Sequence, residues 1–472
     1  MTTVQSTTTV PLAELRAEFA LRLASLYGTE VPAYNTLVDV SREVNQDFVA
    51  EHGADAERLG SIDRVTAERH GAIRVGSPQE LAEAARVFAG FGMHPVGFYD
   101  LRDASKSAVP VVSTAFRPIE SEELAKNPFR VFTSMLVSTD RRFFDAETEA
   151  RLERFIACRT LFPDELLELA DRSATHQGLS VEDAARYLDL ATAAFELFTE
   201  PVDHDWYFKL EKISAVAADI GGVPSTHINH LTPRVLDIDA LYERMEARGI
   251  AMIDEIQGPP SWEGPDVLLR QTSFKALAEE RRFRHVDGTV RPGSLRVRFG
   301  EVEQRGVALT VRGRDRYDRM VAEVDARLAV ALAGTTRVDV ARVVWRENLP
   351  TTERELALQG LAFFTYRVNT TADSPGGQSA SLRDLLNTGV LEPEPIVYED
   401  FLPRSAAGIF QSNLTDEGTR DDELLGTPYD IEKLSQVIGI PIADPAALYQ
   451  AQQDASLAQA AETLGLRQIT TD

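Results

Sequence analysis

Two separate stretches of this chain have the same predicted order of elements: a strand, a helix and then three strands. They cover residues 66–138 and 224–310. A repeated βαβββ unit is typical of a duplicated module, in which two curved sheets pair around a shared cavity. A nucleotide-binding fold built as one continuous unit does not have this order. We therefore predict an α+β protein in which two βαβββ modules form a cavity between curved sheets.

Local signals define both modules. In the first, Ser77, Pro78 and Glu80 begin a helix as its N-cap, N1 and N3 residues. In the second, Asp237 and Asp239 precede the helix ALYERMEARG. The strand-like runs of the first module are ERHGAIRVGS, HPVGFYDL, VPVVSTAF and PFRVFTSML. Those of the second are THINHLTP, AMIDEIQG, VLLRQTSFKAL and SLRVRFGEVEQ.

Helical patterns dominate outside the two modules. Apolar residues three or four apart open the chain at residues 12–27, and they recur after residue 140, for example in SVEDAARYLDLATAAFELF. We expect the last part of the chain to cover the open side of the cavity. The predicted regions are an N-terminal helical segment (1–65), the first module (66–139), a helical insertion (140–222), the second module (223–310) and a helical or irregular C-terminal cover (311–472).

Composition limits the partners of the chain. Its 472 residues carry a formal net charge of −25, which repels nucleic acid and anionic lipid. The same field repels a small anionic substrate, so a carboxylate substrate requires arginines in its pocket. The single cysteine, Cys158, excludes an internal disulfide and a cysteine-rich metal site. The N-terminus lacks a signal-peptide pattern, and no apolar run reaches the roughly 18 residues of a membrane span, so we expect a cytoplasmic protein.

Two histidines and a glutamate, His70, His230 and Glu301, lie in predicted strands of the two modules. Two imidazoles and one carboxylate on one face of Fe(II) leave positions open for a chelating substrate and O2. Two alternatives stay open. His227 lies three residues before His230, and alternation in a strand lets only one of them enter the cavity. Glu303 shares a face with Glu301, about 7 Å along the strand, so spacing does not choose between them.

Each candidate ligand, taken alone, also has an ordinary structural interpretation. His70 fits a surface histidine at a strand end, and His230 fits a hydrogen-bonded core residue. Glu301 fits one half of an ion pair with Arg298 or Arg305. The joint placement favours a shared metal site, because the first strand of each module carries one candidate and the last strand of the second carries another.

A resemblance to one known family rests on six motifs: ERHGAIRVG, FRVFTS, HINHLTPRVLDID, LLRQTSFKAL, RFGEVEQRG and YEDFLPRSAAGIFQSNL. They resemble the 2-oxoadipate dioxygenase/decarboxylase family, also called hydroxyglutarate synthase. This family was formerly a domain of unknown function and is related to vicinal oxygen chelate enzymes. The resemblance runs from near residue 12 to beyond residue 450, and it implies that both modules are of the vicinal oxygen chelate type.

The resemblance also implies roles for particular residues. The family's metal ligands fall on His70, His230 and Glu301. Its substrate-contacting arginine falls on Arg74, and its active-site serine matches Ser405. The residue before this serine can be aliphatic in the family but is Arg404 here. Whether Arg404 contacts the substrate or points outward stays open.

Arg74 follows His70 by four residues on the same strand face, roughly 13 Å along the strand. This spacing suits an elongated substrate with a chelating head at the metal and an anionic tail on the guanidinium. Taken alone, Arg74 also fits a surface arginine paired with an acid. Gln271, Ser273 and Lys275 share one face of a strand in the second module and are weaker candidates for polar contacts with the substrate.

By resemblance, the chain is an Fe(II)-dependent dioxygenase and decarboxylase of lysine degradation. It would convert 2-oxoadipate and O2 into D-2-hydroxyglutarate and CO2, so its partners are a small 2-oxo dicarboxylate and O2. Two other functions fit the same residues. One is a non-oxidative isomerase or lyase of the chelate superfamily, which usually has a fourth protein ligand. The other is a non-catalytic dicarboxylate-binding protein. The sequence sets neither the oligomeric state nor the chain length of the 2-oxo acid.

Overall fold

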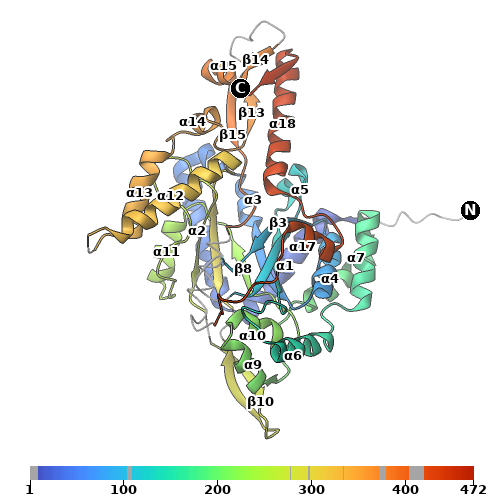
Figure 1. Ribbon diagram of the computed structural model, residues 1–472. Helices are drawn as coiled ribbons and strands as arrows, with labels where there is room; N and C mark the ends of the chain where they lie inside the picture. The colour runs from blue at the N-terminus through green and yellow to red at the C-terminus, as the bar shows by residue number, and fades with distance from the viewer. Residues whose placement is uncertain are drawn as a thin grey trace, which may run out of the picture.

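The structure is a computed structural model that describes residues 9–103, 109–276, 278–295, 298–332, 334–370, 379–402 and 419–471. A five-stranded sheet in the order β3-β4-β5-β2-β8 lies at its centre (Figure 1). Its strands are β2 (Arg69–Val75), β3 (His94–Asp100), β4 (Val111–Arg117), β5 (Arg130–Leu136) and β8 (His230–Pro233). β2 is parallel to β5 and antiparallel to β8, so the two predicted modules meet within this sheet.

The first module has the predicted order, β2, α4 (Pro78–Ala89), β3, β4 and β5. Ser77 caps α4, because its side chain accepts a hydrogen bond from the backbone N–H of Glu80. Ile73 and Val75 enter the core that β2 shares with α4. Since side chains alternate along a strand, the even-numbered residues of β2 face the opposite side of the sheet.

The second module begins as predicted and then departs from the pattern. β8 is followed by α11 (Ile238–Ala247), β9 (Leu269–Phe274) and β12 (Gly300–Arg305), and β9 pairs with β12 in antiparallel register. Residues 251–258 were predicted as a strand, but they form only isolated bridges to β9. A further bridge, between Arg234 and Glu303, sets β12 beside the end of β8.

A hairpin that the sequence did not lead us to expect lies between β9 and β12. Its strands, β10 (Glu279–Arg284) and β11 (Val290–Leu295), pair antiparallel. The run SLRVRFGEVEQ was predicted as one strand, but it begins in β11 and ends in β12. The turn explains the hairpin: Gly288 has a φ of +78°, and the Asp287 side chain accepts a hydrogen bond from the N–H of Thr289 (2.9 Å). An Asp-Gly pair between alternating residues is a recognised hairpin signal.

Helices precede and follow the first module. The N-terminal elements are β1 (Thr9–Pro11), α1 (Leu12–Glu30), α2 (Ala33–His52), η1 (Gly53–Glu57) and α3 (Ile62–Ala67). A short helix, α5 (Ser121–Lys126), joins β4 to β5. The elements between the modules are α6 (Ala146–Ala157), α7 (Asp164–His176), β6 (Gly178–Ser180), α8 (Val181–Ala193), β7 (Val202–Asp203), α9 (His204–Glu211) and α10 (Ala215–Gly221). α10 contacts β2, so this region reaches the central sheet.

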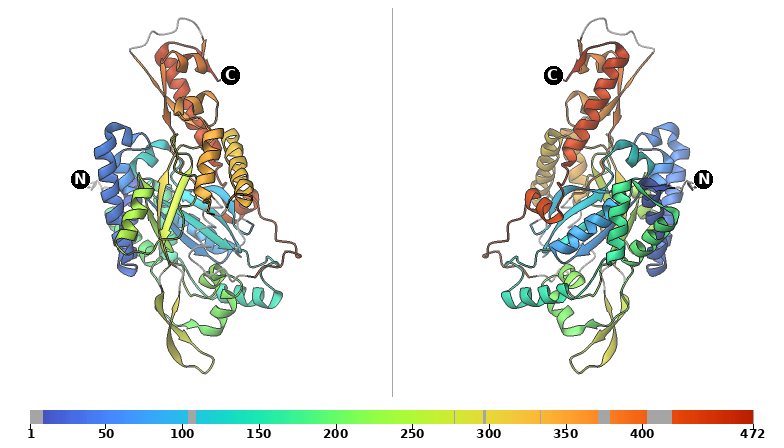
Figure 2. Two further views of the ribbon diagram at one scale, coloured as in Figure 1. Left: turned by 90° about the vertical axis from the view of Figure 1, so that its left-hand side faces the viewer. Right: turned by 90° about the vertical axis from the view of Figure 1, so that its right-hand side faces the viewer.

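The last part of the chain contains small sheets as well as helices. Its helices are α12 (Val311–Ala329), α13 (Arg337–Asn348), α14 (Glu353–Leu358), α15 (Leu382–Asn387), α17 (Ile431–Ile438) and α18 (Pro445–Leu464). Its strands are β13 (Phe364–Val368), β14 (Ser379–Ser381), β15 (Leu391–Pro395) and β16 (Gln468–Thr470). β13 to β16 and α18 extend from one end of the molecule, and the β10–β11 hairpin extends from the other (Figures 1 and 2). In the described parts of the chain, no helix has both the length and the apolar character that a membrane span needs.

Candidate metal centre

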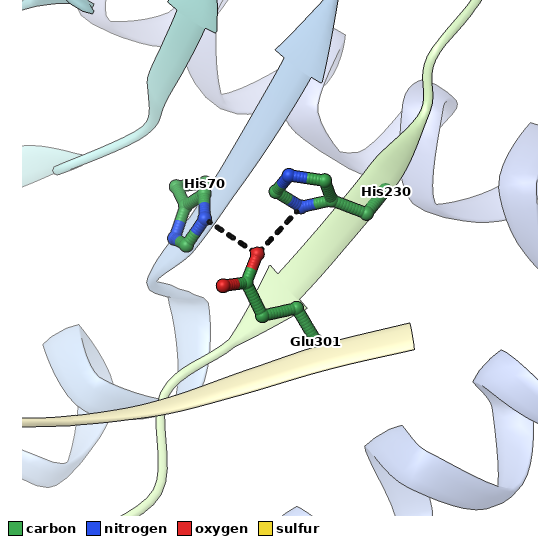
Figure 3. A group of neighbouring side chains, drawn as sticks. All are labelled: His70, His230 and Glu301. Atoms are coloured by element: carbon green, nitrogen blue, oxygen red, sulfur yellow. Dashed lines mark ion pairs between the residues drawn. The ribbon is translucent and has the colours of Figure 1, made fainter. Parts of the chain in front are cut away.

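Three neighbouring strands carry the candidate ligands. His70 lies on β2, His230 on β8 and Glu301 on β12. In the register of β2 and β8, His230 lies opposite Ala72 and His70 lies opposite Thr232. Each of the three side chains offers one ligand atom, and these atoms lie within 4.8 Å of one another (Figure 3). Among the described residues, no other group of three or more potential ligands is close enough to hold a metal ion.

One oxygen of Glu301 lies between the two imidazoles. Its Oε2 atom is 3.1 Å from Nδ1 of His230 and 3.5 Å from Nε2 of His70 (Figure 3). Thr232 donates a hydrogen bond from Oγ1 to the same oxygen (3.4 Å). All three candidate ligands are buried. Two imidazoles and one carboxylate that converge away from water have the composition of a site for a divalent metal.

Aromatic rings lie against both histidines. Phe401 meets the His70 ring edge to face, with ring centroids 5.0 Å apart. Phe299 stacks on His230 at 5.5 Å, with an interplanar angle of 19°. Both phenylalanines are buried. They keep water from these sides of the imidazoles, and electrostatic interactions are stronger where water is excluded.

The protonation states suit metal binding. Burial, together with the charges of His70 and Arg74, lowers the pKa of His230 to about 4, so its imidazole is neutral near pH 7. Burial acts to raise the pKa of Glu301, but His230 and His70 outweigh it and lower that pKa. Burial also acts against a charged His70, yet its contacts with Glu303 and Glu301 raise its pKa. A bound cation would replace the proton on this ring, so the residues fit a divalent metal.

His227, the alternative to His230, lies in a different cluster. Its Nε2 atom is 3.4 Å from Oδ1 of Asp219 on α10. The strand β8 begins at His230, so residues 226–229 are not part of it. Alternation along a strand therefore does not explain why the two histidines are separate. His227 instead lies with Asp219, the partner of Arg74.

Glu303, the alternative to Glu301, lies at the other nitrogen of the His70 ring. Its Oε2 atom is 2.9 Å from Nδ1 of His70, whereas Glu301 approaches Nε2. Burial acts to raise the pKa of Glu303, but Arg305, His70 and Arg130 outweigh it and lower that pKa to about 2. Glu303 is therefore ionised and already paired with arginines. Glu301 is the carboxylate that joins both imidazoles.

Arg74 is buried rather than at the surface. Its guanidinium pairs with Asp219, and Asn229 donates a hydrogen bond from Nδ2 to the same carboxylate (2.9 Å). Asp219 could not be predicted from the sequence, because an ion pair between residues 145 positions apart leaves no local pattern. Arg74 is close enough to the ligand group to lower the pKa of His230.

The remaining candidate contact residues fall in different places. Gln271 and Ser273 are buried, and Ser273 lies opposite Glu301 in the register of β9 and β12. Lys275 is exposed and pairs with Asp254 (2.9 Å), which directs it away from the ligand group. The candidates outside the described residues are Ser405 and Arg404.

Buried ion pairs surround this centre. Arg130 on β5 pairs with Glu399, and Arg117 on β4 pairs with Asp400 (2.9 Å). These two pairs anchor the segment that places Phe401 against His70. The other members of the network are Arg64, Glu68, Arg234, Glu303 and Arg305. The sequence did not predict these ion pairs, because the paired residues are far apart along the chain.

Comparisons with known proteins agree on one family. A family model described as 2-oxoadipate dioxygenase/decarboxylase matches residues 19–413. A Mycobacterium tuberculosis protein named 2-oxoadipate dioxygenase/decarboxylase is 54% identical over 438 residues, which are 93% of this chain and 96% of that protein. A Pseudomonas putida protein of the same name is 39% identical over 461 residues, or 96% of this chain and 97% of that protein.

A solved structure agrees with these relatives. The crystal structure of the hydroxyglutarate synthase in complex with 2-oxoadipate from Pseudomonas putida is 36% identical to this chain and has a TM-score of 0.82. The similarity covers 97% of this chain and 99% of that one. It confirms the predicted fold class, and the family match extends across both modules and all three candidate ligands. The chain therefore belongs to the 2-oxoadipate dioxygenase/decarboxylase family.

Proposed function

We propose that this chain is an Fe(II)-dependent dioxygenase that converts 2-oxoadipate and O2 into D-2-hydroxyglutarate and CO2, as a cytoplasmic step of lysine degradation. The observation that carries the proposal is the group of His70, His230 and Glu301, whose ligand atoms lie within 4.8 Å of one another. Relatives with 54% and 39% identity are named 2-oxoadipate dioxygenase/decarboxylase. A solved relative contains bound 2-oxoadipate.

The side chains of His70, His230 and Glu301 would hold the metal. Neutral His230 and ionised Glu301 are in the forms that bind a divalent cation. A divalent metal held by these three residues would supply a binding site for the 2-oxo acid head and for O2. Bound Fe(II) supplies the redox chemistry that couples the reduction of O2 to the loss of CO2.

Arg74 is the proposed anchor for the far carboxylate of the substrate. A protein with a net charge of −25 needs a specific cation to hold a dianion. Asp219 pairs with Nη1 of Arg74 and restrains the side chain. A restrained guanidinium loses less conformational entropy on binding, so this ion pair prepares the anchor for a carboxylate. By the resemblance, Ser405 adds a further contact.

Two buried phenylalanines exclude water from the proposed reaction site. Phe299 and Phe401 lie against the imidazoles of His230 and His70. The Arg117–Asp400 ion pair holds the segment that ends at Phe401. A site without bulk water fixes the pose of the substrate and limits side reactions with solvent.

The proposed reaction balances without another reactant. The bond between C1 and C2 of 2-oxoadipate breaks, and C1 leaves as CO2. One atom of O2 completes a new carboxylate at the former C2, and the other becomes a hydroxyl on the adjacent carbon. The substrate is oxidised and O2 is reduced, so no external reductant is required.

The test uses metal-free protein that is loaded with Fe(II) without oxygen and then given 2-oxoadipate and ¹⁸O2. We expect one O2 consumed and one CO2 released for each 2-hydroxyglutarate, with both labelled atoms in the 2-hydroxyglutarate. Product formation without uptake of O2 would instead indicate an isomerase or lyase. Binding of 2-oxoadipate without any product would indicate a dicarboxylate-binding protein.

A further inference from the structure

The two nitrogens of His70 face two different carboxylates. Nε2 lies 3.5 Å from Oε2 of Glu301, and Nδ1 lies 2.9 Å from Oε2 of Glu303. All three side chains are buried. A metal-bound histidine usually directs its second ring nitrogen to a carboxylate or carbonyl, which fixes the tautomer and the orientation of the ring. Glu303 lies at hydrogen-bonding distance from Nδ1, and Nδ1 has no aligned hydrogen-bond acceptor among the described residues, so a small rotation of the ring or the carboxylate completes this arrangement.

Glu303 is held far more firmly than Glu301. Arg305 approaches it with two donors, Nε at 2.7 Å from Oε1 and Nη2 at 2.9 Å from Oε2. Arg130 adds a contact from Nη1 to Oε1 (3.4 Å). Arg305 is fixed in turn, because its Nη1 donates to the backbone carbonyls of Tyr398 (2.6 Å) and Asp400 (3.1 Å). The carboxylate of Glu303 therefore has little freedom to leave His70.

Glu301 has partners of a different kind. Its Oε2 atom contacts the two imidazoles and accepts a hydrogen bond from Thr232. In the described part of the chain, no arginine or lysine pairs with it. Two carboxylates on one face of β12 are thus divided in their roles: Glu301 is available to a cation, and Glu303 is already neutralised by guanidinium groups.

We infer that Glu303 is a positioning residue, which accepts the Nδ1 proton of His70 and so directs Nε2 to the metal. This inference rests on the metal site of the proposed function. It goes beyond the ligand set, because Glu303 is not one of the three side chains whose ligand atoms converge. The charge of Glu303 also favours the imidazole that donates from Nδ1, and this increases the basicity of Nε2.

The test measures metal affinity, which needs neither substrate nor turnover. The metal-free wild type and Glu303→Gln are titrated with Co(II), and binding is followed by calorimetry and by visible absorption. Glutamine has nearly the shape of glutamate but not its charge. We expect the dissociation constant of Co(II) to rise about 10–100-fold, which is typical of losing an outer partner of a metal-bound histidine.

Glu399→Gln is the matched control. Glu399 is also buried and pairs with Arg130 and Arg64 in the same network, but it has no contact with His70 in the described structure. We expect it to lower the melting temperature about as much as Glu303→Gln does, while it leaves the Co(II) affinity unchanged, because the Arg117–Asp400 pair still holds the segment that ends at Phe401. Equal losses of affinity in the two variants would mean that the network acts only through stability, and the inference would be wrong.

Two further measurements test the role of Glu303 independently of how well the single variant folds. If Glu303→Gln does not fold, the double variant Glu303→Gln/Arg305→Gln removes the unpaired guanidinium as well, and the same loss of affinity is expected. In the Co(II) form, proton NMR detects the Nδ1 proton of a bound imidazole as a shifted, exchangeable signal. We expect this signal to move or to exchange faster in Glu303→Gln than in Glu399→Gln.

The outcomes separate this inference from the proposed function. A wild type that binds metal but does not oxidise 2-oxoadipate would remove the proposed function and leave the role of Glu303 testable by affinity. A Glu303→Gln variant that binds Co(II) as tightly as the wild type, with an unchanged imidazole signal, would overturn the role of Glu303 whatever the activity.

Discussion

Two buried polar clusters lie along β2, and they differ in how their acids are neutralised. In the ligand group, Glu301 contacts two imidazoles but no arginine or lysine among the described residues. In the second cluster, Asp219 already pairs with Arg74. Among the described residues, Glu301 has no arginine or lysine partner, whereas Asp219 has Arg74. This difference indicates that the ligand group is suited to a metal ion, whereas the second cluster presents a restrained arginine.

Each of two chain segments contributes to both clusters. β2 supplies His70 to the ligand group and Arg74 to the second cluster. The segment that leads into β8 supplies His230 to the first and His227 to the second. β8 pairs antiparallel with β2 at His70 and His230. Before β8, the Thr226 side chain donates a hydrogen bond to the backbone carbonyl of Arg74 (2.9 Å), which keeps this segment beside β2 as far as the second cluster. Substitutions at matched residues therefore separate the two roles.

Metal removal should have the largest effect on the ligand group. We expect a chelator to abolish turnover of 2-oxoadipate, and added Fe(II) to restore it. Zn(II) should occupy the same ligands without restoring activity, because it has no accessible redox change. Oxygen uptake and product formation measure both results. Full activity with Zn(II) would show that the ligand group does not serve oxygen chemistry.

The substitution His230→Ala should have the next largest effect. It removes one of three ligands, so we expect the metal content to fall to background. Activity should fall more than about 100-fold, since the loss of an outer partner alone costs about 10–100-fold. Metal analysis of the purified variant and oxygen uptake provide the measurement. Metal content near the wild-type level would contradict the role of His230 as a ligand.

Arg74→Ala tests the second cluster without touching the ligands. The lost charge-assisted hydrogen bonds are worth about 1.5–3 kcal/mol, so kcat/KM for 2-oxoadipate should fall at least about tenfold. The metal content should stay near that of the wild type. The defect should be much smaller with 2-oxohexanoate, which has the same chain length but no tail carboxylate. Arg74→Lys should recover only part of the loss, because an ammonium lacks the planar fork.

The partner of Arg74 requires its own control. Alanine at position 74 leaves Asp219 without its guanidinium, and an unpaired buried carboxylate is itself destabilising. The double variant Arg74→Ala/Asp219→Asn removes both charges. We expect it to fold better than Arg74→Ala and still to prefer the monoacid relative to the wild type. Turnover of 2-oxoadipate at the wild-type rate in both variants would show that Arg74 does not hold the tail.

The sequence predicted the ligand group better than the second cluster. The first module follows its local signals: α4 begins at the predicted cap, and the apolar runs of β4 and β5 are buried on both faces. His70, His230 and Glu301 could be named from their strands and from the family motifs. Spacing alone left Glu303 open, and its contact with Nδ1 of His70 appears only in three dimensions.

The second cluster had no comparable signal. Asp219 lies on a short helix between the modules, and nothing in its neighbourhood distinguishes it from other acidic residues. Its partner Arg74 is 145 positions away. The β10–β11 hairpin is different, because its turn at Asp287 and Gly288 is a local sequence signal. A long-range ion pair depends on the three-dimensional structure, whereas this hairpin is encoded in its own turn residues.

His227→Ala should have the smallest effect and is the matched partner of His230→Ala. The His227 ring lies 3.4 Å from Asp219, which keeps Arg74 and Asn229 as partners when the ring is removed. We expect a loss of about 0.5–3 kcal/mol in the free energy of unfolding, as for most buried substitutions, and a less than tenfold change in kcat/KM. The metal content should not change, because His227 is outside the ligand group. Thermal unfolding, metal analysis and kinetics on both histidine variants give the measurement. If both lose metal equally while folded, His227 has a part in metal binding, and the boundary between the two clusters is drawn in the wrong place.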